Sequence, residues 1–245
     1  MRIRVCDLET TGEKPPEAMP CEIGWCDVVQ VGEAWVLDPN SNQGEVFVQP
    51  GHPIPPKVSA IHHIVDADVA VAAPWAQIAP SVLDNHFQEV GTPPAVALAA
   101  HFAKFERQWC TDEITGGLSW ICTWKCALRL WPEAPSHSNG ALRYWRGHKL
   151  NREIADKSHR AFPDAYVTAH HLLDMLNGGA TVDQLIAISA APALLPRVNF
   201  GKHRGAAWSA VPSDYIDWVL RQNDMDENVI FTAKHELARR RTAEP

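Results

Sequence analysis

Segments typical of strands and of helices alternate through about the first 178 of the 245 residues of this chain. Strands are predicted over Arg2–Cys6, over Cys21–Val31 and around Glu45–Gln49. Ala95–Ala100 is a short apolar run of the kind found in strands buried within parallel sheets. A fifth strand is expected over Leu118–Thr123. This alternation predicts an α/β domain built on a mixed sheet.

Helices are expected between and after these strands. The predicted helices cover Pro56–Ile64, Trp75–Val90, Phe102–Trp109, Lys125–Trp131 and Phe162–Asn177. Gly178 and Gly179 follow the last of them, as glycine commonly follows the end of a helix.

The composition becomes rich in alanine and proline from Leu185 onward. We therefore expect a domain over residues 1–180, a connection over 181–196 and a small C-terminal α+β unit over 197–245. In that unit Ser213 is a candidate N-cap, with Asp214 favoured in the first turn by the helix dipole.

Two acidic residues, Asp7 and Glu9, are predicted to continue the first strand. Side chains alternate between the faces of a strand, so the two carboxylates share one face at a separation of roughly 6–7 Å. Like charges at that distance oppose joint ionisation, and a hard divalent cation such as Mg²⁺ removes the conflict. The pair is either half of a metal site or two solvated acids on a surface strand.

Composition narrows the class of protein. The net charge is −7, which argues against a protein that coats nucleic acid through overall charge but is compatible with a nuclease that has an acidic metal site. No apolar run approaches the ~20 residues that span a bilayer, and no signal-peptide pattern precedes the first strand. We expect a cytoplasmic protein without membrane contact, whose six cysteines are reduced and mostly buried.

Further acidic residues occur where they could join the first pair. Glu106 is expected one helical turn beyond the buried strand, where open α/β sheets bind ligands. Proline is tolerated in the first turn of a helix, so Pro163 places Asp164 just inside a helix and His159 on the loop before it. The loop would let His159 reach a metal ion bound by Asp164.

Three segments in this order resemble the motifs of the DEDDh family of 3′–5′ exonucleases, which share an RNase H-like fold. They are Asp7–Gly12, His101–Glu106 and His159–Ala165. Ile61–Ile64 is similar to a family segment near the 3′ end of the substrate. Other segments resemble the exonuclease X group of bacteria, so that the resemblance covers nearly the whole chain: Trp120–Lys125, Leu130–Pro132, Phe200–Gly205 and Pro212–Trp218. It implies an RNase H-like mixed five-stranded sheet flanked by helices.

The resemblance also implies a reaction: hydrolysis of DNA phosphodiester bonds from the 3′ end with two Mg²⁺ ions, for which Mn²⁺ would substitute, releasing nucleoside monophosphates. Asp7 would bridge both ions, Glu9 and Asp164 would complete the first site, and Glu106 would hold the second. His159, whose reference pKa is ~6.5, would act as general base toward the attacking water.

Contacts to the nucleic acid are expected from residues near the first two motifs and in the C-terminal unit: Thr10, Thr11, Gly12, His62, Phe102, Lys202 and Arg204. Glycine permits close approach of a nucleotide to the backbone. The basic turn of the C-terminal unit could instead belong to a packing or dimerisation unit, which leaves a homodimer open.

Phe102 and Glu106 depart from the family pattern, which has Asn and Asp there. Glu adds one methylene and reaches ~1.5 Å further, while Mg²⁺ is strict about distance. The two residues are predicted to share a helix face, with Phe102 stacking on the terminal base or filling space.

Two alternatives to a DNA exonuclease remain open from the sequence. The substrate is expected to be single-stranded DNA or the 3′ end of a duplex, but RNA is an alternative. The departures at Phe102 and Glu106 also leave a nucleic-acid-binding module with a degenerate site.

Overall fold

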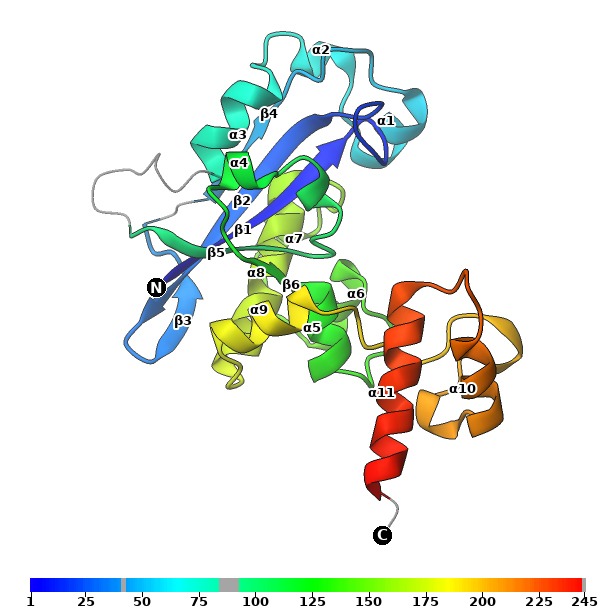
Figure 1. The fold of residues 1–245 in the computed structure, drawn as a ribbon. Helices are drawn as coiled ribbons and strands as arrows, with labels where there is room; N and C mark the ends of the chain where they lie inside the picture. The colour runs from blue at the N-terminus through cyan, green and yellow to red at the C-terminus, as the bar shows by residue number, and fades with distance from the viewer. Residues whose placement is uncertain (41–42, 84–92, 244–245) are drawn as a thin grey trace.

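A computed structural model describes residues 1–40, 43–83 and 93–243. Within these ranges a mixed sheet of six strands forms the centre of the larger part of the molecule (Figure 1). The strands are β1 (Arg2–Thr10), β2 (Pro20–Val31), β3 (Ala34–Leu37), β4 (Gln43–Phe47), β5 (Ala95–Ala100) and β6 (Trp120–Cys122). Their order is β3-β2-β1-β5-β6, and β4 also pairs with β2. β1 pairs antiparallel with β2 and parallel with β5, which confirms the predicted mixed sheet.

The sheet has six strands rather than the predicted five because β2 has two partners on one edge. Its first half pairs with β4 and its second half with β3. The two-residue turn Gly32–Glu33 joins β2 to β3, and Gly32 has a φ of 62°, a value that the favoured two-residue hairpin turns require. The four-residue β3 was missed from the sequence because it is too short to show a pattern of its own.

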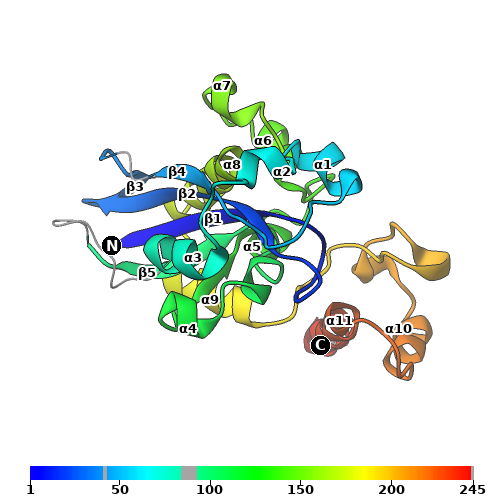
Figure 2. The same ribbon diagram turned by 90° about the horizontal axis from the view of Figure 1, so that it is seen from above.

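Helices cover both faces of the sheet. Their bounds are α1 (Pro56–His62), α2 (Asp66–Val69), α3 (Trp75–Leu83), α4 (Asp112–Thr115), α5 (Thr123–Leu130), α6 (Asn139–Trp145), α7 (Arg152–Ala155), α8 (Ala161–Asn177) and α9 (Val182–Ala190). Ile3 and Val5 of β1 belong to the hydrophobic cluster that contains α8. The alternate residues Cys6 and Leu8 belong to the cluster that contains α3. Figure 2 shows α8 and α3 on opposite sides of β1. Asp7 therefore continues the face of β1 that α8 covers.

Two of the predicted helices differ from the structure. Residues 102–109 form turns and a short 3₁₀ helix (Glu106–Gln108) instead of an α-helix. Phe102 has a φ of 71°, and a left-handed residue cannot continue a right-handed helix. The helix predicted over Trp75–Val90 ends at Leu83, and the rest of that range lies outside the described residues.

The predicted connection contains a helix that sequence composition concealed. The Thr181 hydroxyl accepts a hydrogen bond from the Gln184 amide and opens α9. Leu185 of α9 is fully buried in the same cluster as α8. Only residues 191–196 therefore remain as irregular connecting chain.

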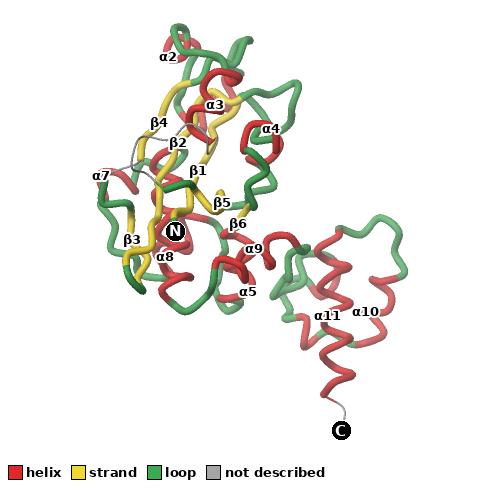
Figure 3. The backbone as a smooth tube through the Cα atoms, turned by 60° about the vertical axis from the view of Figure 1, so that its left-hand side comes forward, coloured by secondary structure: helices red, strands yellow, loops and turns green. Residues whose placement is uncertain are grey.

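The C-terminal unit has a hydrophobic cluster of its own, which includes Trp208, Ile216 and Val229. Its main helices are α10 (Ser213–Leu220) and α11 (Glu227–Ala243), beside the sheet in Figure 3. The β-structure described in this predicted α+β unit is one bridge between Arg197 and Ala207. The N-cap of α10 is Pro212 rather than Ser213, while Asp214 does lie in the first turn.

All six cysteines are free and buried, as predicted: Cys6, Cys21, Cys26, Cys110, Cys122 and Cys126. Burial raises the pKa of each of these thiols above its ordinary value. The helices that the structure describes are all too short or too polar to cross a bilayer.

Candidate active site

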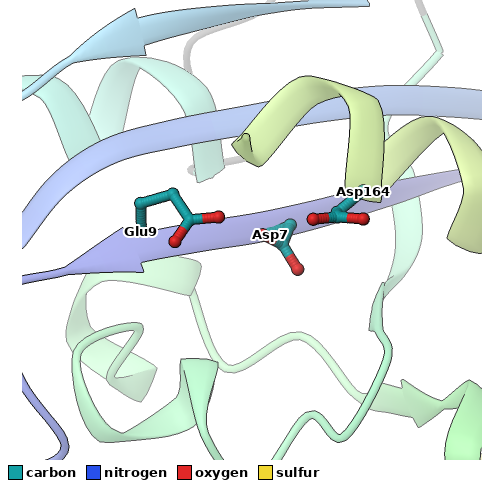
Figure 4. A group of neighbouring side chains, drawn as sticks. All are labelled: Asp7, Glu9 and Asp164. Carbon is teal, nitrogen blue, oxygen red and sulfur yellow. The ribbon is translucent and has the colours of Figure 1, made fainter. Parts of the chain in front are cut away.

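Three carboxylates meet beside the end of β1. Asp7 and Glu9 come from the strand, and Asp164 comes from the first turn of α8 (Figure 4). One oxygen from each lies within 4.8 Å of the others. The strand alternation and the proline-marked helix start thus predicted the positions of all three correctly.

The start of α8 is seated tightly on β2. A Cβ on Gly24 would lie 2.1 Å from the backbone nitrogen of Phe162, so only glycine allows the two backbones to come this close. The fully buried Glu22 accepts hydrogen bonds from the Arg160 guanidinium, with Nε at 3.0 Å, and from the Ala161 amide at 2.9 Å. These contacts fix the turn that carries Asp164 toward β1.

The geometry of this turn also constrains His159. Its φ is 61°, and its backbone N–H donates to Oδ2 of Asp164 at 2.7 Å. The exposed His159 side chain lines a cleft of about 520 Å³ together with Asp7 and Asp164. The predicted general base is therefore at the same cleft as two of the carboxylates.

Burial and mutual repulsion make the acidic cluster unfavourable when it is ionised. Burial, and then the charge of Asp164, raises the pKa of Asp7 well above its ordinary value. The same two causes raise the pKa of Glu9 to about 8, although the Arg160 charge opposes them. Burial also raises the pKa of Asp164, against the hydrogen bond from His159. The predicted conflict between these acids is present, and a cation would relieve it.

Glu106 supplies a further buried acid near this cluster. Its side chain is 2% exposed, and its Oε2 has no hydrogen-bond partner among the described residues. Burial raises its pKa to about 8, and repulsion from Glu9 adds to that. It lies outside the group of three whose oxygens fall within 4.8 Å. A buried, unpartnered carboxylate oxygen needs a proton or a cation, so these four acids fit the binding of divalent metal ions.

Phe102 and Glu106 do not share a face, contrary to the prediction. Phe102 is 44% exposed, and its ring meets Trp124 edge-on at a centroid distance of 5.0 Å. Glu106 is buried at the start of the 3₁₀ helix, four residues after the left-handed turn at Phe102.

A second cleft of about 850 Å³ lies on the Glu9 side of the strand end. Glu9, Thr10, Thr11, Gly12 and His62 all line it. The Thr10 hydroxyl donates to the Gly12 carbonyl at 2.6 Å, which holds the loop after β1 in shape. The predicted nucleotide-contacting residues of the first motif are thus gathered at one hollow.

Other contacts near the site follow no prediction from sequence. Asn139 donates from its side chain to the Asp164 carbonyl at 3.1 Å, and His101 lines the same cleft as Asp7. His101 was noted only as part of a motif, and Asn139 follows a serine at a helix start, a pattern too common to single out. Lys202 and Arg204 lie in the C-terminal unit and line neither of the two clefts.

The family model described as Exonuclease matches residues 5–172, a range that includes all four acids and His159. The chain belongs to this exonuclease family. Exodeoxyribonuclease 10 of Escherichia coli (strain K12) is 35% identical over 242 residues, covering 96% of this chain and 98% of that protein. The similarity to this relative thus includes the C-terminal unit of the chain as well as its exonuclease domain.

Solved structures agree with this assignment. Exonuclease X in complex with 5′ overhanging duplex DNA matches with a TM-score of 0.58 and 30% identity, over 76% of this chain and 99% of that one. The nuclease domain of a DEDDh-family 3′ exonuclease bound to rAMP matches in fold, with a TM-score of 0.54 and 17% identity over 75% and 94% of the two chains. The predicted RNase H-like fold and DEDDh type of this exonuclease are confirmed.

Proposed function

We propose that the protein is a 3′–5′ exodeoxyribonuclease that hydrolyses DNA by a two-metal mechanism and releases nucleoside monophosphates. The observation that carries the proposal is Glu106, a buried carboxylate near a cluster of three further acids, with one oxygen of its own that has no hydrogen-bond partner among the residues that the structure describes. Four acids whose pKa values are all raised form a site suited to hard cations. DNA as the substrate is supported by the name of the 35% identical relative and by the DNA-bound Exonuclease X.

In this proposal Asp7, Glu9 and Asp164 would hold one Mg²⁺ ion, and Glu106 would help to hold a second one. Mn²⁺ would substitute because it accepts the same oxygen ligands. Bound divalent ions would lower the pKa of the attacking water and neutralise the negative charge that develops on the leaving 3′-oxygen.

His159 accepts the proton of the attacking water. Its exposed ring lines the cleft that also contains Asp7 and Asp164, so that solvent and substrate both reach it. The left-handed turn at His159 and the hydrogen bond from its own amide to Asp164 hold the backbone beneath the ring.

Substrate lies across the strand end between the two clefts. The 3′-terminal nucleotide occupies the hollow lined by Thr10, Thr11, Gly12 and His62. The exposed Phe102 ring, supported by Trp124, stacks on a base.

Replacement of Asp7 tests the proposal. Wild type should shorten a 3′-labelled DNA oligonucleotide in Mg²⁺, and Asp7→Asn should abolish this while circular dichroism and the melting temperature show an intact fold. Asp183→Asn, an exposed acid in the first turn of α9, is the matched control and should retain full activity. Equal activity of Asp7→Asn and wild type would sink the proposal.

The departures at Phe102 and Glu106 motivate a second candidate, a binding module with a degenerate site. Tight binding of DNA without turnover in either Mg²⁺ or Mn²⁺ would support it. Parallel digestion of matched DNA and RNA oligonucleotides separates the deoxyribonuclease from an exoribonuclease.

A further inference from the structure

Three aromatic rings form a stack on the C-terminal unit, which we name the aromatic platform: Phe200, Tyr215 and Trp218. The Phe200 and Tyr215 ring centroids are 6.4 Å apart with an interplanar angle of 24°. Tyr215 and Trp218 are 5.2 Å apart at 29°. Tyr215 is buried, but Trp218 is 42% exposed. The platform therefore ends in an indole ring that is supported from beneath and open to solvent.

A basic turn is pressed against the same platform. Gly201 has a φ of 57°, which favours glycine, and a Cβ there would lie 2.6 Å from the Tyr215 hydroxyl, so a larger residue would have to displace that ring. Lys202 follows, with its Nζ 5.2 Å from the Tyr215 ring centroid. Arg204 is exposed on the same turn. The turn thus brings the Lys202 ammonium group beside the platform, with Arg204 two residues further along.

The charge of this unit differs from that of the remainder of the chain. Residues 197–245 contain eight Lys and Arg against seven Asp and Glu, a net charge of +1, so residues 1–196 have a net charge of −8. The acids Asp214 and Asp217 lie on α10 with Trp218. Local charge is therefore close to balanced, and a partner would be held by ring stacking as well as by phosphate contacts.

We propose that Trp218 stacks on an unpaired base of a single-stranded nucleic acid while Lys202 and Arg204 contact its phosphates. Inside a duplex both faces of each base are covered by neighbouring bases, whereas a single strand can turn a base face toward an aromatic ring, so the platform favours single strands. The proposal rests on the nuclease function proposed above. The C-terminal unit would bind a part of the strand that lies away from the active-site carboxylates and so keep the substrate attached.

Binding by the full-length protein tests the platform without consuming the ligand. An Asp7→Asn background and fluorescence anisotropy with a labelled single-stranded DNA measure the dissociation constant. We expect Trp218→Ala to weaken binding at least about fivefold, and Trp218→Phe to retain most of the affinity. Leu130→Ala, an exposed apolar residue on α5 that is 38% exposed, is the matched control and should bind like the parent.

Salt dependence tests the basic turn. Lys202→Gln and Arg204→Gln should each reduce the slope of log affinity against log salt by about 0.7, the value for one phosphate contact to a single strand. Blunt duplex DNA should be insensitive to Trp218→Ala. Unchanged single-strand binding in Trp218→Ala, with the parent melting temperature retained, would overturn the proposal.

The outcome is separable from that of the nuclease proposal. If wild type degrades neither DNA nor RNA but Trp218→Ala still weakens single-strand binding, the platform stands and the nuclease function fails. If wild type degrades DNA and the Trp218 variants bind like the parent, the platform alone fails.

Discussion

Glu106 is the residue on which the metal-binding interpretation depends most. Its carboxylate is buried, one of its oxygens has no hydrogen-bond partner in the described parts of the chain, and burial raises its pKa to about 8. A neutral carboxyl at that position is tolerated, whereas an ionised one needs a counter-ion. Glu106 is one methylene longer than the Asp of the family pattern, and the 3₁₀ turn that carries it keeps its carboxylate buried.

Glu106→Gln should have opposite effects on stability and on activity. At pH 8.5 without metal it removes a buried charge, and we expect a rise in melting temperature of about 2–4 °C for each kcal/mol gained. At pH 5, where Glu106 is protonated, wild type and variant should melt together. Exonuclease turnover in Mg²⁺ should fall by about 100-fold or more because one metal site loses its anionic ligand. An unchanged rate would contradict the assignment of Glu106.

The raised pKa values of Glu9 and Glu106, both about 8, predict a pH dependence of metal binding. Without metal, the folded protein keeps protons that the unfolded chain releases between about pH 4.5 and pH 8. Stability from these two groups is therefore full below about pH 4.5 and declines toward pH 8. A cation competes with the protons, so the rise in melting temperature on adding Mg²⁺ over EDTA should grow from pH 5 to pH 8. A constant increment across this range would contradict the prediction.

Among single residues, the sequence predicted best those whose position follows from the alternation of a strand or from the start of a helix. Asp7 and Glu9 share a face because strand side chains alternate, and Asp164 lies in a first turn because of Pro163. The turns and 3₁₀ helix around Glu106 could not be predicted, because they follow a left-handed backbone at Phe102, a conformation that phenylalanine rarely adopts.

At the scale of elements, the packing of α8 on β2 determines where Asp164 meets the acids of β1. Gly24→Ala would place a methyl group 2.1 Å from the Phe162 nitrogen. We expect a loss of about 1–3 kcal/mol or more in the free energy of unfolding, and a larger loss of activity because the start of α8 carries Asp164. Urea unfolding and oligonucleotide digestion measure the two effects.

Gly140→Ala is the matched control for this substitution. Gly140 is in helix α6, and no atom of residues 1–40, 43–83 or 93–243 lies within 4 Å of a Cβ built there, its own helix backbone and chain neighbours aside. The variant should be equal to wild type in stability or up to about 1 kcal/mol more stable. Equal effects of the two substitutions would show that the seating of α8 tolerates displacement.

Strands and helices were predicted correctly where a local sequence pattern determines them, and wrongly where tertiary contacts determine the structure. β5 matches its predicted bounds because a six-residue apolar run has few alternatives. α9 was read as connecting chain because an alanine- and proline-rich composition obscured its capping box, although Leu185 packs in the main cluster. The helix predicted at Phe102–Trp109 has the right composition, but the turn that positions Glu106 replaces it.

At the scale of the whole molecule, the hydrophobic cluster of the C-terminal unit shares no residue with the two clusters that flank the sheet. The ion pair between Lys104 and Glu227 spans 3.6 Å with both side chains largely exposed, so it contributes little. We expect residues 197–243 to unfold in a separate transition. Calorimetry of the full chain should resolve two transitions, and hydrogen exchange should assign the weaker one to α10 and α11. A single coincident transition would contradict this expectation.

The enclosure of all six thiols has a practical consequence. Alkylating reagents attack exposed thiolates, and here every native sulfur is both shielded and held in its neutral form. A single cysteine introduced on the surface can therefore carry a fluorophore or spin label while the native cysteines are left in place. With one label on a cysteine at position 183, in place of Asp183, and a second label on a DNA strand, the distance between the protein and the DNA can be measured while the rest of the sequence is unchanged.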